Sequence, residues 1–230
     1  MKIVVIGGTG ILGSKVVDRL RDHGDEAVAA SPRTGVNTLT GEGLAEALTG
    51  ADVVVDVSNS PSFDDDPAME FFTKSTTNLE AAANAAGVKH YVAVSIVGSD
   101  QLPESGYLRA KVAQEKLIEE SEIPYSIVRA TQFAEFAEAI TASMTVGEEV
   151  RVPDALIQPI AAEDLAAEVA RVAEGEPLRR IENIGGPQKI SFEQMAREVL
   201  ARKGEVKTVV VDPQAGYFGT PLSMNSLVTA

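Results

Sequence analysis

The sequence predicts an α/β fold in which helices cover both faces of one doubly wound parallel β-sheet. Short apolar runs alternate with segments of helical periodicity over most of the chain, as strand–helix–strand units do. Residues 53–57 are mostly valine, which is typical of a parallel strand buried on both faces. The length of 230 residues, with 44% hydrophobic and 23% charged residues, is enough for one such domain with a full core.

The first strand, expected at residues 3–6, runs directly into a glycine-rich turn and then into a helix expected at 11–22. In this strand–turn–helix order Gly7 would allow the sharp turn, Gly10 would let a pyrophosphate approach the backbone, and Gly13 would let the helix lie close to the strand. The first N–H groups of the helix would face the phosphates. The turn therefore predicts a fold that binds a dinucleotide through its phosphates. The cofactor contacts expected here are Gly7, Thr9, Gly10, Ile11, Leu12 and Gly13.

The remaining elements follow in the same alternation. Further strands are expected at residues 27–30, 53–57, 91–95 and 125–128, with a short additional strand at 36–39. Helices are expected at residues 44–48, 67–86 and 106–120. Beyond residue 129 the pattern loosens into a helix around residues 133–140, short pieces at 149–152 and 156–160, helices at 163–173 and 191–202, and a strand at 206–211. We expect a single domain, 1–230, with a dinucleotide-binding core at about 1–130 and a small C-terminal substrate-binding lobe at about 131–230.

Composition excludes several classes of function. The net charge of −14 argues against nucleic acid as a partner, because phosphate binding requires clustered Lys and Arg. The absence of cysteine excludes disulfides, thiolate catalysis and cysteine-ligated zinc, and with only two histidines no metal site is expected. No apolar run reaches membrane-spanning length, and the expected first strand leaves no room for a signal peptide. These features predict a soluble, cytoplasmic protein with a small-molecule substrate.

The end of the second strand bears on the choice of cofactor. An acidic residue at this place holds the ribose 2′-hydroxyl of NAD(H), but the chain has none there. Ser31 and Arg33 could instead bind a 2′-phosphate, Arg33 through charge-assisted hydrogen bonds. The sequence therefore favours NADP(H), with NAD(H) as the alternative. Ser58 and Asn59 follow the strand at 53–57 and could also line the cofactor.

A second motif suggests carbonyl chemistry. Tyr107 and Lys111 are four residues apart, so they share one face of the helix expected at 106–120. A nearby ammonium would lower the pKa of the tyrosine, which could then give its proton to a developing alkoxide. Lys111 could also hydrogen-bond the cofactor ribose. The pattern alone is common on helix surfaces, and its place after a strand of a dinucleotide-binding fold is what gives it weight.

Together these motifs resemble the short-chain dehydrogenase/reductase superfamily, specifically its atypical NmrA-like, NAD(P)-binding branch. The resemblance covers about residues 1–165 and implies a Rossmann fold, an NAD(P) cofactor and a pocket roofed by the C-terminal part. It also implies that Ser95 hydrogen-bonds a substrate carbonyl beside Tyr107. Tyr107 follows Ser95 by only twelve positions, fewer than in the catalytic members, which leaves open whether both reach one carbonyl. The matching segments are residues 7–13, 78–82, 87–90, 94–95, 107–111 and 123–129.

The expected substrate pocket lies beyond the strand at 125–128, where two phenylalanines would suit a flat or aromatic molecule such as a quinone. Its expected residues are Thr131, Gln132, Phe133, Phe136 and Gln158. The function expected from all of these features is NADP(H)-dependent hydride transfer to a carbonyl or quinone. The alternatives are a non-catalytic NAD(P) sensor or accessory protein and, third, a tailoring enzyme that oxygenates or isomerises aromatic metabolites.

Overall fold

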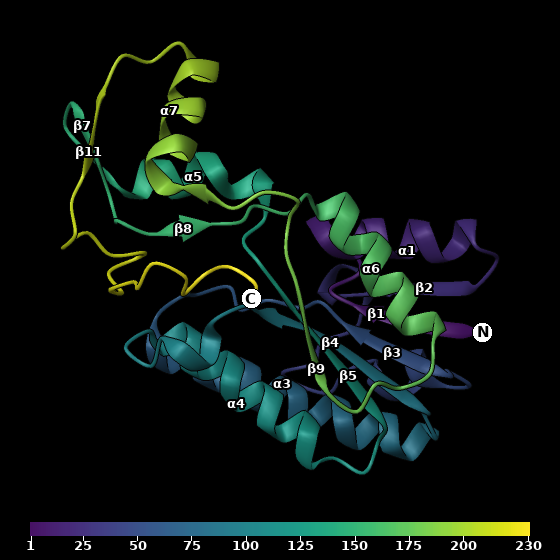
Figure 1. The fold of residues 1–230 in the computed structure, drawn as a ribbon. Coiled ribbons are helices and arrows are strands. Elements are labelled where there is room, and N and C mark those ends of the chain that lie inside the picture. Colours follow the sequence, from purple (N-terminus) through teal and green to yellow (C-terminus); the bar gives the residue numbers. More distant parts are fainter.

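The computed structural model describes residues Met1–Ala230 and confirms the α/β class, with a parallel sheet of six strands in the order β2-β1-β3-β4-β5-β9. The three central β1, β3 and β4 strands are almost wholly buried, as their valine-rich sequences predict. Figure 1 shows the sheet with helices on both faces. The strands are β1 (Lys2–Ile6), β2 (Glu26–Ala30), β3 (Val53–Asp56), β4 (His90–Ile96), β5 (Tyr125–Ala130) and β9 (Ile181–Ile184).

Two separate cores fix the helices to the sheet. On one face α1 and α6 pack together over the strands, where Leu12, Val16 and Leu165 belong to one apolar cluster. On the other face α2, α3 and α4 build a second cluster that includes Leu79 and Ile118. Each helix has its apolar stripe turned to the sheet, as amphipathic periodicity predicts. The helices are α1 (Ile11–Asp22), α2 (Leu44–Leu48), α3 (Asp65–Ala86), α4 (Gly106–Glu120) and α6 (Ala162–Glu174).

The prediction of a strand at residues 36–39 is wrong. This segment follows a 3-10 turn, η1 (Pro32–Thr34), and its backbone bonds within its own loop and to α3 instead of to the sheet. The Asn37 N–H donates to the Glu42 backbone carbonyl at 2.9 Å, and the Asn78 side chain donates to the Thr38 carbonyl at 2.8 Å. The local apolar pattern was therefore that of a buried loop, and β2 remains the edge of the sheet.

The C-terminal part forms a small lobe with its own apolar cluster, which includes Ile140, Val150, Phe192 and Leu227. Its strands make two small sheets, β11-β7-β6 and β10-β8. The tail after residue 212 returns from the lobe toward the main sheet, where the C-terminus lies (Figure 1). The elements are α5 (Ala137–Ser143), α7 (Phe192–Lys203), β6 (Thr145–Val146), β7 (Glu149–Val152), β8 (Leu156–Ile157), β10 (Ile190–Ser191) and β11 (Thr208–Val211).

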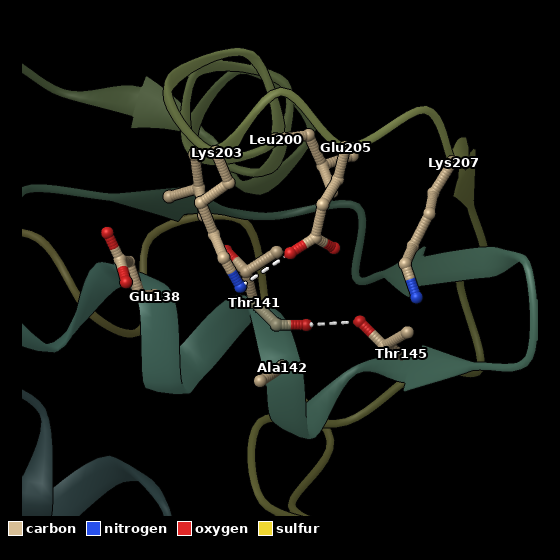
Figure 2. A pocket seen from close by; sticks show the side chains of 9 residues that line it. Glu138, Thr141, Ala142, Thr145, Leu200, Lys203, Glu205 and Lys207 are labelled. Carbon is tan, nitrogen blue, oxygen red and sulfur yellow. Dashed lines mark hydrogen bonds and ion pairs between the residues drawn. The ribbon is translucent and has the colours of Figure 1, made fainter.

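The lobe also carries a hollow of about 330 Å³ between α5, α7 and the β6–β7 hairpin (Figure 2). Its charges are partly satisfied by each other, since Lys203 pairs with Glu205 at 2.6 Å. The Thr145 hydroxyl donates to the Thr141 carbonyl at 2.9 Å across the same hollow. All of its lining residues belong to the lobe and none to the glycine turn or the strand ends, so it is separate from the site expected there.

Gly13 allows α1 to lie against the end of β1, and this contact yields a stability prediction. A Cβ at Gly13 would lie 2.2 Å from the Gly7 carbonyl oxygen, so Gly13→Ala should force the helix away from the turn. We expect a loss of about 3 kcal/mol in the free energy of unfolding, measured by urea denaturation. Ser14→Ala, at an exposed neighbouring position, should stay within about 0.5 kcal/mol of wild type. An equally stable Gly13→Ala variant would contradict this packing.

Candidate functional site

The glycine turn lies at the carboxyl edge of the sheet, where the ends of β1, β2 and β3 are in register. Gly7 has φ +78°, a conformation that favours glycine, and a Cβ at Gly8 would lie 2.6 Å from the Val5 carbonyl oxygen. A Cβ at Gly10 would meet only the Gly7 oxygen, at 3.3 Å, and Gly10 is exposed. The turn is thus tightly packed on its inner side and open on its outer side at Gly10, as a bound phosphate requires.

The start of α1 presents unused hydrogen-bond donors beside this opening. The helix has no side-chain cap and no acidic residue in its first turn. Its first backbone bond is Ser14 N–H to the Gly10 carbonyl, at 3.0 Å. The N–H groups of Ile11, Leu12 and Gly13 therefore have no acceptor within the protein and lie at the positive end of the helix dipole, which is where a pyrophosphate binds best. These residues fit a dinucleotide.

The end of β2 is joined to the glycine turn through Thr9, whose hydroxyl donates to the Ser31 hydroxyl oxygen at 3.0 Å. Ser31 is buried and caps η1, with its own N–H donating to the Thr34 hydroxyl oxygen at 2.9 Å. Arg33 is exposed on this short turn and takes part in none of the ion pairs of the protein. Its guanidinium is therefore available to an anionic ligand, whereas the Ser31 hydroxyl is engaged within the protein.

Asp56 at the end of β3 is a buried carboxylate that the sequence analysis did not single out, although it is the one charged residue in a valine run. It accepts hydrogen bonds from the Ser58 hydroxyl at 2.6 Å, the Tyr91 hydroxyl at 3.2 Å and the Gln114 amide at 3.1 Å. The Ser58 hydroxyl, expected to face the cofactor, is thus held inside the protein. Asn59 is exposed and accepts a hydrogen bond from another predicted site residue, Tyr107.

Tyr107 stands at the start of α4, half-buried among aromatic rings. Its ring centroid lies 5.0 Å from that of Phe63 and 5.7 Å from that of Phe72, and its hydroxyl donates to Asn59 Oδ1 at 2.6 Å. Burial raises the pKa of Tyr107 to about 12, against a smaller lowering by the Asn59 hydrogen bond. The expected lowering by Lys111 does not occur, so Tyr107 carries its proton at neutral pH.

Lys111 is directed into the protein because its partners lie beneath α4. Its ammonium donates to the Val94 carbonyl at 3.0 Å and to the Gln114 side-chain oxygen, and it lies 4.4 Å from the centroid of the Phe72 ring. Burial lowers the pKa of Lys111 to about 8, although the negative charges of Asp56 and Glu115 oppose the shift. Tyr107 and Lys111 therefore share a helix face and both contact Phe72, but they make no hydrogen bond to each other.

Ser95, expected beside the substrate carbonyl, belongs to a buried ionic cluster. Its hydroxyl donates to Glu115 Oε1 at 2.5 Å, and the same carboxylate accepts two hydrogen bonds from Arg129, at 2.9 and 2.6 Å. Arg129 also pairs with Asp100 at 3.0 Å, which holds the loop after β4 against β5. The Glu115 hydrogen bond, opposed by burial, leaves the pKa of Arg129 above its usual range. The structure thus joins Ser95 to Glu115 and not to Tyr107.

Three polar residues and two phenylalanines are expected to line the substrate pocket, and the polar residues differ in their hydrogen bonding. Thr131 and Gln158 hold the chain together: the Thr131 hydroxyl donates to the Gln158 carbonyl at 2.5 Å, and the Gln158 amide donates to the Gly186 carbonyl at 2.7 Å. Gln132 is only 8% exposed, yet neither its amide nitrogen nor its oxygen has a hydrogen-bond partner. A buried amide without partners is costly, so a bound group that satisfies it is the physical expectation at this strand end.

The two phenylalanines of the expected pocket stack on each other. Their ring centroids are 5.5 Å apart and the planes differ by 6°. Phe133 packs against the core beneath α1 and α6, whereas Phe136 is 44% exposed. Phe133 is thus part of the core, and Phe136, on the 3-10 turn η3 (Ala134–Phe136), can offer an aromatic face to a ligand.

Comparison with known proteins supports the dinucleotide binding that the glycine turn predicts. A family model described as NAD(P)H-binding matches residues 7–176, from the first glycine of the turn to just beyond α6. The chain belongs to this NAD(P)H-binding family. Among curated relatives, the photosystem II assembly factor Ycf39 of Synechocystis is 26% identical over 147 residues, which are 58% of this chain and 45% of Ycf39. The chain thus matches less than half the length of that relative.

Solved structures share the fold of this NAD(P)H-binding protein at low sequence identity. A UDP-glucose 4-epimerase of Thermus thermophilus with NAD has a TM-score of 0.75 at 18% identity, covering 99% of this chain and 92% of that one. The NADPH-dependent quinone oxidoreductase QOR2 of Escherichia coli with NADPH has a TM-score of 0.72 at 23% identity, covering 91% and 77%. In the present structure, no helix is both long and apolar enough to cross a membrane.

The buried cluster around Arg129 predicts a large stability effect. Arg129→Met would leave the Glu115 carboxylate buried without its cation, at a cost of about 3–5 kcal/mol in the free energy of unfolding. Urea denaturation measures the loss. Adding Glu115→Gln to Arg129→Met removes the unpaired charge and should recover part of the lost free energy of unfolding. If the single variant loses less than about 1 kcal/mol, the cluster does not hold the fold as described.

Proposed function

We propose that this protein is an NADPH-dependent reductase that acts on a carbonyl or quinone of a small, flat, aromatic molecule. The observation that carries the proposal is the shared position of two features at the carboxyl edge of the sheet. The free N–H groups of α1 suit the cofactor's pyrophosphate, and Tyr107 is a proton-bearing phenol surrounded by aromatic rings. The fold shared with an NADPH-dependent quinone oxidoreductase is consistent with it.

The preference for NADPH is supported by the end of β2. Arg33 is exposed beside the glycine turn without an ion-pair partner, and no acidic side chain follows the strand to hold a ribose 2′-hydroxyl. A guanidinium suits a 2′-phosphate because it donates parallel charge-assisted hydrogen bonds. NADH, which lacks this phosphate, would lose that contact.

The chain's own residues supply a proton and hold the groups around it. When bound, the nicotinamide supplies a hydride to the carbonyl carbon of the substrate. Tyr107 gives its proton to the carbonyl oxygen, which takes the place of Asn59 as acceptor, and solvent restores the proton. The pKa of about 12 keeps Tyr107 protonated, which favours the reductive direction. Lys111 and Ser95 act as positioning residues, because they tie α4 to β4 through Val94, Gln114 and Glu115.

A second candidate is a non-catalytic NAD(P)H sensor or assembly factor. It is favoured by the internal engagement of Ser95 and Lys111, two members of the expected catalytic set. The similarity to Ycf39, named as a photosystem II assembly factor, supports the same alternative. The two candidates differ in one measurement. A sensor binds NADPH but does not oxidise it when a panel of quinones and ketones is added.

Replacement of Arg33 tests the cofactor preference. Arg33→Ala should weaken NADPH binding about tenfold or more and leave NADH binding unchanged, because the lost interaction is a charge-assisted hydrogen bond to the 2′-phosphate. Calorimetric titration of both cofactors measures the difference. Arg202→Ala, an exposed arginine on α7, is the matched control and should bind both cofactors as wild type does. Tighter binding of NADH than of NADPH by wild type would refute the preference.

Replacement of Tyr107 tests the proton donor. Tyr107→Phe should lower kcat for a reducible quinone or ketone about 100-fold while the Kd for NADPH stays the same. The wild-type rate should show no loss from Tyr107 ionisation between pH 7 and about 10, since the pKa of its phenol is about 12. Tyr125→Phe is the control and should turn over as wild type does, because Tyr125 is at the start of β5, away from the carboxyl edge of the sheet. Unchanged turnover in Tyr107→Phe would remove Tyr107 from the mechanism.

A further inference from the structure

The tail after β11 carries an aromatic turn, residues 217–220, that the proposed function does not use. We propose that this turn forms the lobe-side wall of the same substrate site, and that the Tyr217 hydroxyl donates a hydrogen bond to an oxygen of a flat aromatic substrate. Tyr217 would then determine specificity, opposite Tyr107. This inference rests on the proposed function, because it assumes that the substrate is bound at the Tyr107 edge of the sheet.

The turn is a tight hairpin with an unusual backbone. The N–H of Tyr217 donates to the Thr220 carbonyl at 2.8 Å, and the N–H of Thr220 donates back at 3.0 Å. Both central residues have positive φ, Phe218 at +47° and Gly219 at +81°. This is the geometry of a turn that prefers Asn-Gly, and a bulky aromatic residue is strained at its first central position. Phe218 lies at the tip of the turn, and its side chain is 65% exposed.

Tyr217 is held with its ring packed and its hydroxyl unengaged. Its ring centroid lies 6.1 Å from that of Phe192 in the lobe and 4.8 Å from that of Phe218. Tyr217 and Tyr107 both pack against the apolar cluster of the lobe, which brings the two residues to the same region. Burial raises the pKa of Tyr217, and the neighbouring Tyr107 phenol raises it further. The Tyr107 hydroxyl donates to Asn59, whereas the Tyr217 hydroxyl meets no acceptor within the protein. A ligand oxygen would supply one.

The tail around the turn is fixed rather than loose. Before it, the Asp212 N–H donates to the Val152 carbonyl at 2.8 Å. After it, the Met224 carbonyl accepts from the Leu156 N–H at 2.9 Å, and Leu227 is fully buried against Ile157. The Thr229 N–H donates to the Gln158 side chain at 2.9 Å. These bonds explain why Gln158 is structural, and they hold the turn in one place between the lobe and the main sheet (Figure 1).

Aromatic surfaces thus approach the site from both parts of the molecule. The sheet side offers Phe63, which is 68% exposed, and Tyr107, and the lobe side offers Tyr217 and Phe218. A flat ring between such surfaces gains stacking contacts, and its oxygen can accept from a phenol. A quinone has both features. An aliphatic sugar or acid has no planar face for these rings.

The test uses anthraquinone-2-sulfonate and the NADP⁺-loaded protein, so that binding is measured without turnover. Calorimetry should show that Tyr217→Phe weakens quinone binding about three- to tenfold, the effect of one lost hydrogen bond, while NADP⁺ affinity is unchanged. Tyr125→Phe removes a hydroxyl from the far end of β5 and should bind the quinone as wild type does. Equal affinity of wild type and Tyr217→Phe for the quinone would overturn the inference.

A second variant separates binding from folding. Phe218→Asn gives the turn its preferred Asn-Gly pair, so Tm should rise by roughly 2–4 °C while quinone binding weakens. If Phe218 instead stabilises the fold, Phe218→Asn should lower Tm. Unchanged quinone binding by Phe218→Asn would also count against the turn as a wall of the substrate site. The outcomes distinguish the two proposals. If wild type binds neither NADPH nor the quinone, the proposed function itself fails. If wild type, Tyr217→Phe and Phe218→Asn all bind the quinone with the same affinity, only the role of the turn is overturned.

Discussion

The close contact between α1 and the end of β1 is the constraint on which the site depends. A Cβ at Gly13 would lie 2.2 Å from the Gly7 oxygen, so only glycine lets the helix begin directly above the turn. That placement leaves three N–H groups of α1 without acceptors, while the open side of Gly10 gives an anion access to them. The proposed dinucleotide site is therefore a consequence of backbone packing, and it needs few basic side chains in a protein with a net charge of −14.

A second constraint lies beneath α4, where buried polar groups from three elements share hydrogen bonds. Asp56 at the end of β3, Lys111 and Gln114 on α4, and the Glu115–Arg129 pair are each more than nine-tenths buried. Buried charges must be paired, so these contacts fix the angle at which α4 leaves the sheet. The same contacts draw Lys111 and Ser95 inward, whereas Tyr107, half-buried at the start of the helix, reaches Asn59 beyond the end of β3.

Prediction from the sequence succeeded where local patterns determine structure. The valine run at 53–57 and the glycines at 7–13 have one simple physical interpretation each, and both appear as predicted. It failed at 36–39, because an apolar loop held by Asn78 has the same local pattern as a strand. Helical spacing placed Tyr107 and Lys111 on one face, but the partners of Lys111 come from β4 and from Gln114, so spacing could not give the direction of its ammonium. The Ser95–Glu115–Arg129 cluster depends on contacts distant in sequence, which no local pattern contains. The turn at 217–220 closes by local hydrogen bonds, but its place beside Phe192 is again a contact distant in sequence.

The central claim is that the first N–H groups of α1 bind the pyrophosphate of the cofactor. Two-dimensional amide NMR of the labelled protein during an NADPH titration tests it most directly. The amide signals of Ile11, Leu12 and Gly13 should shift in a saturable way, together with the Arg33 side-chain signal. Saturable binding of NADPH that leaves these amide signals in place, or no binding of NADPH at all, would contradict the account.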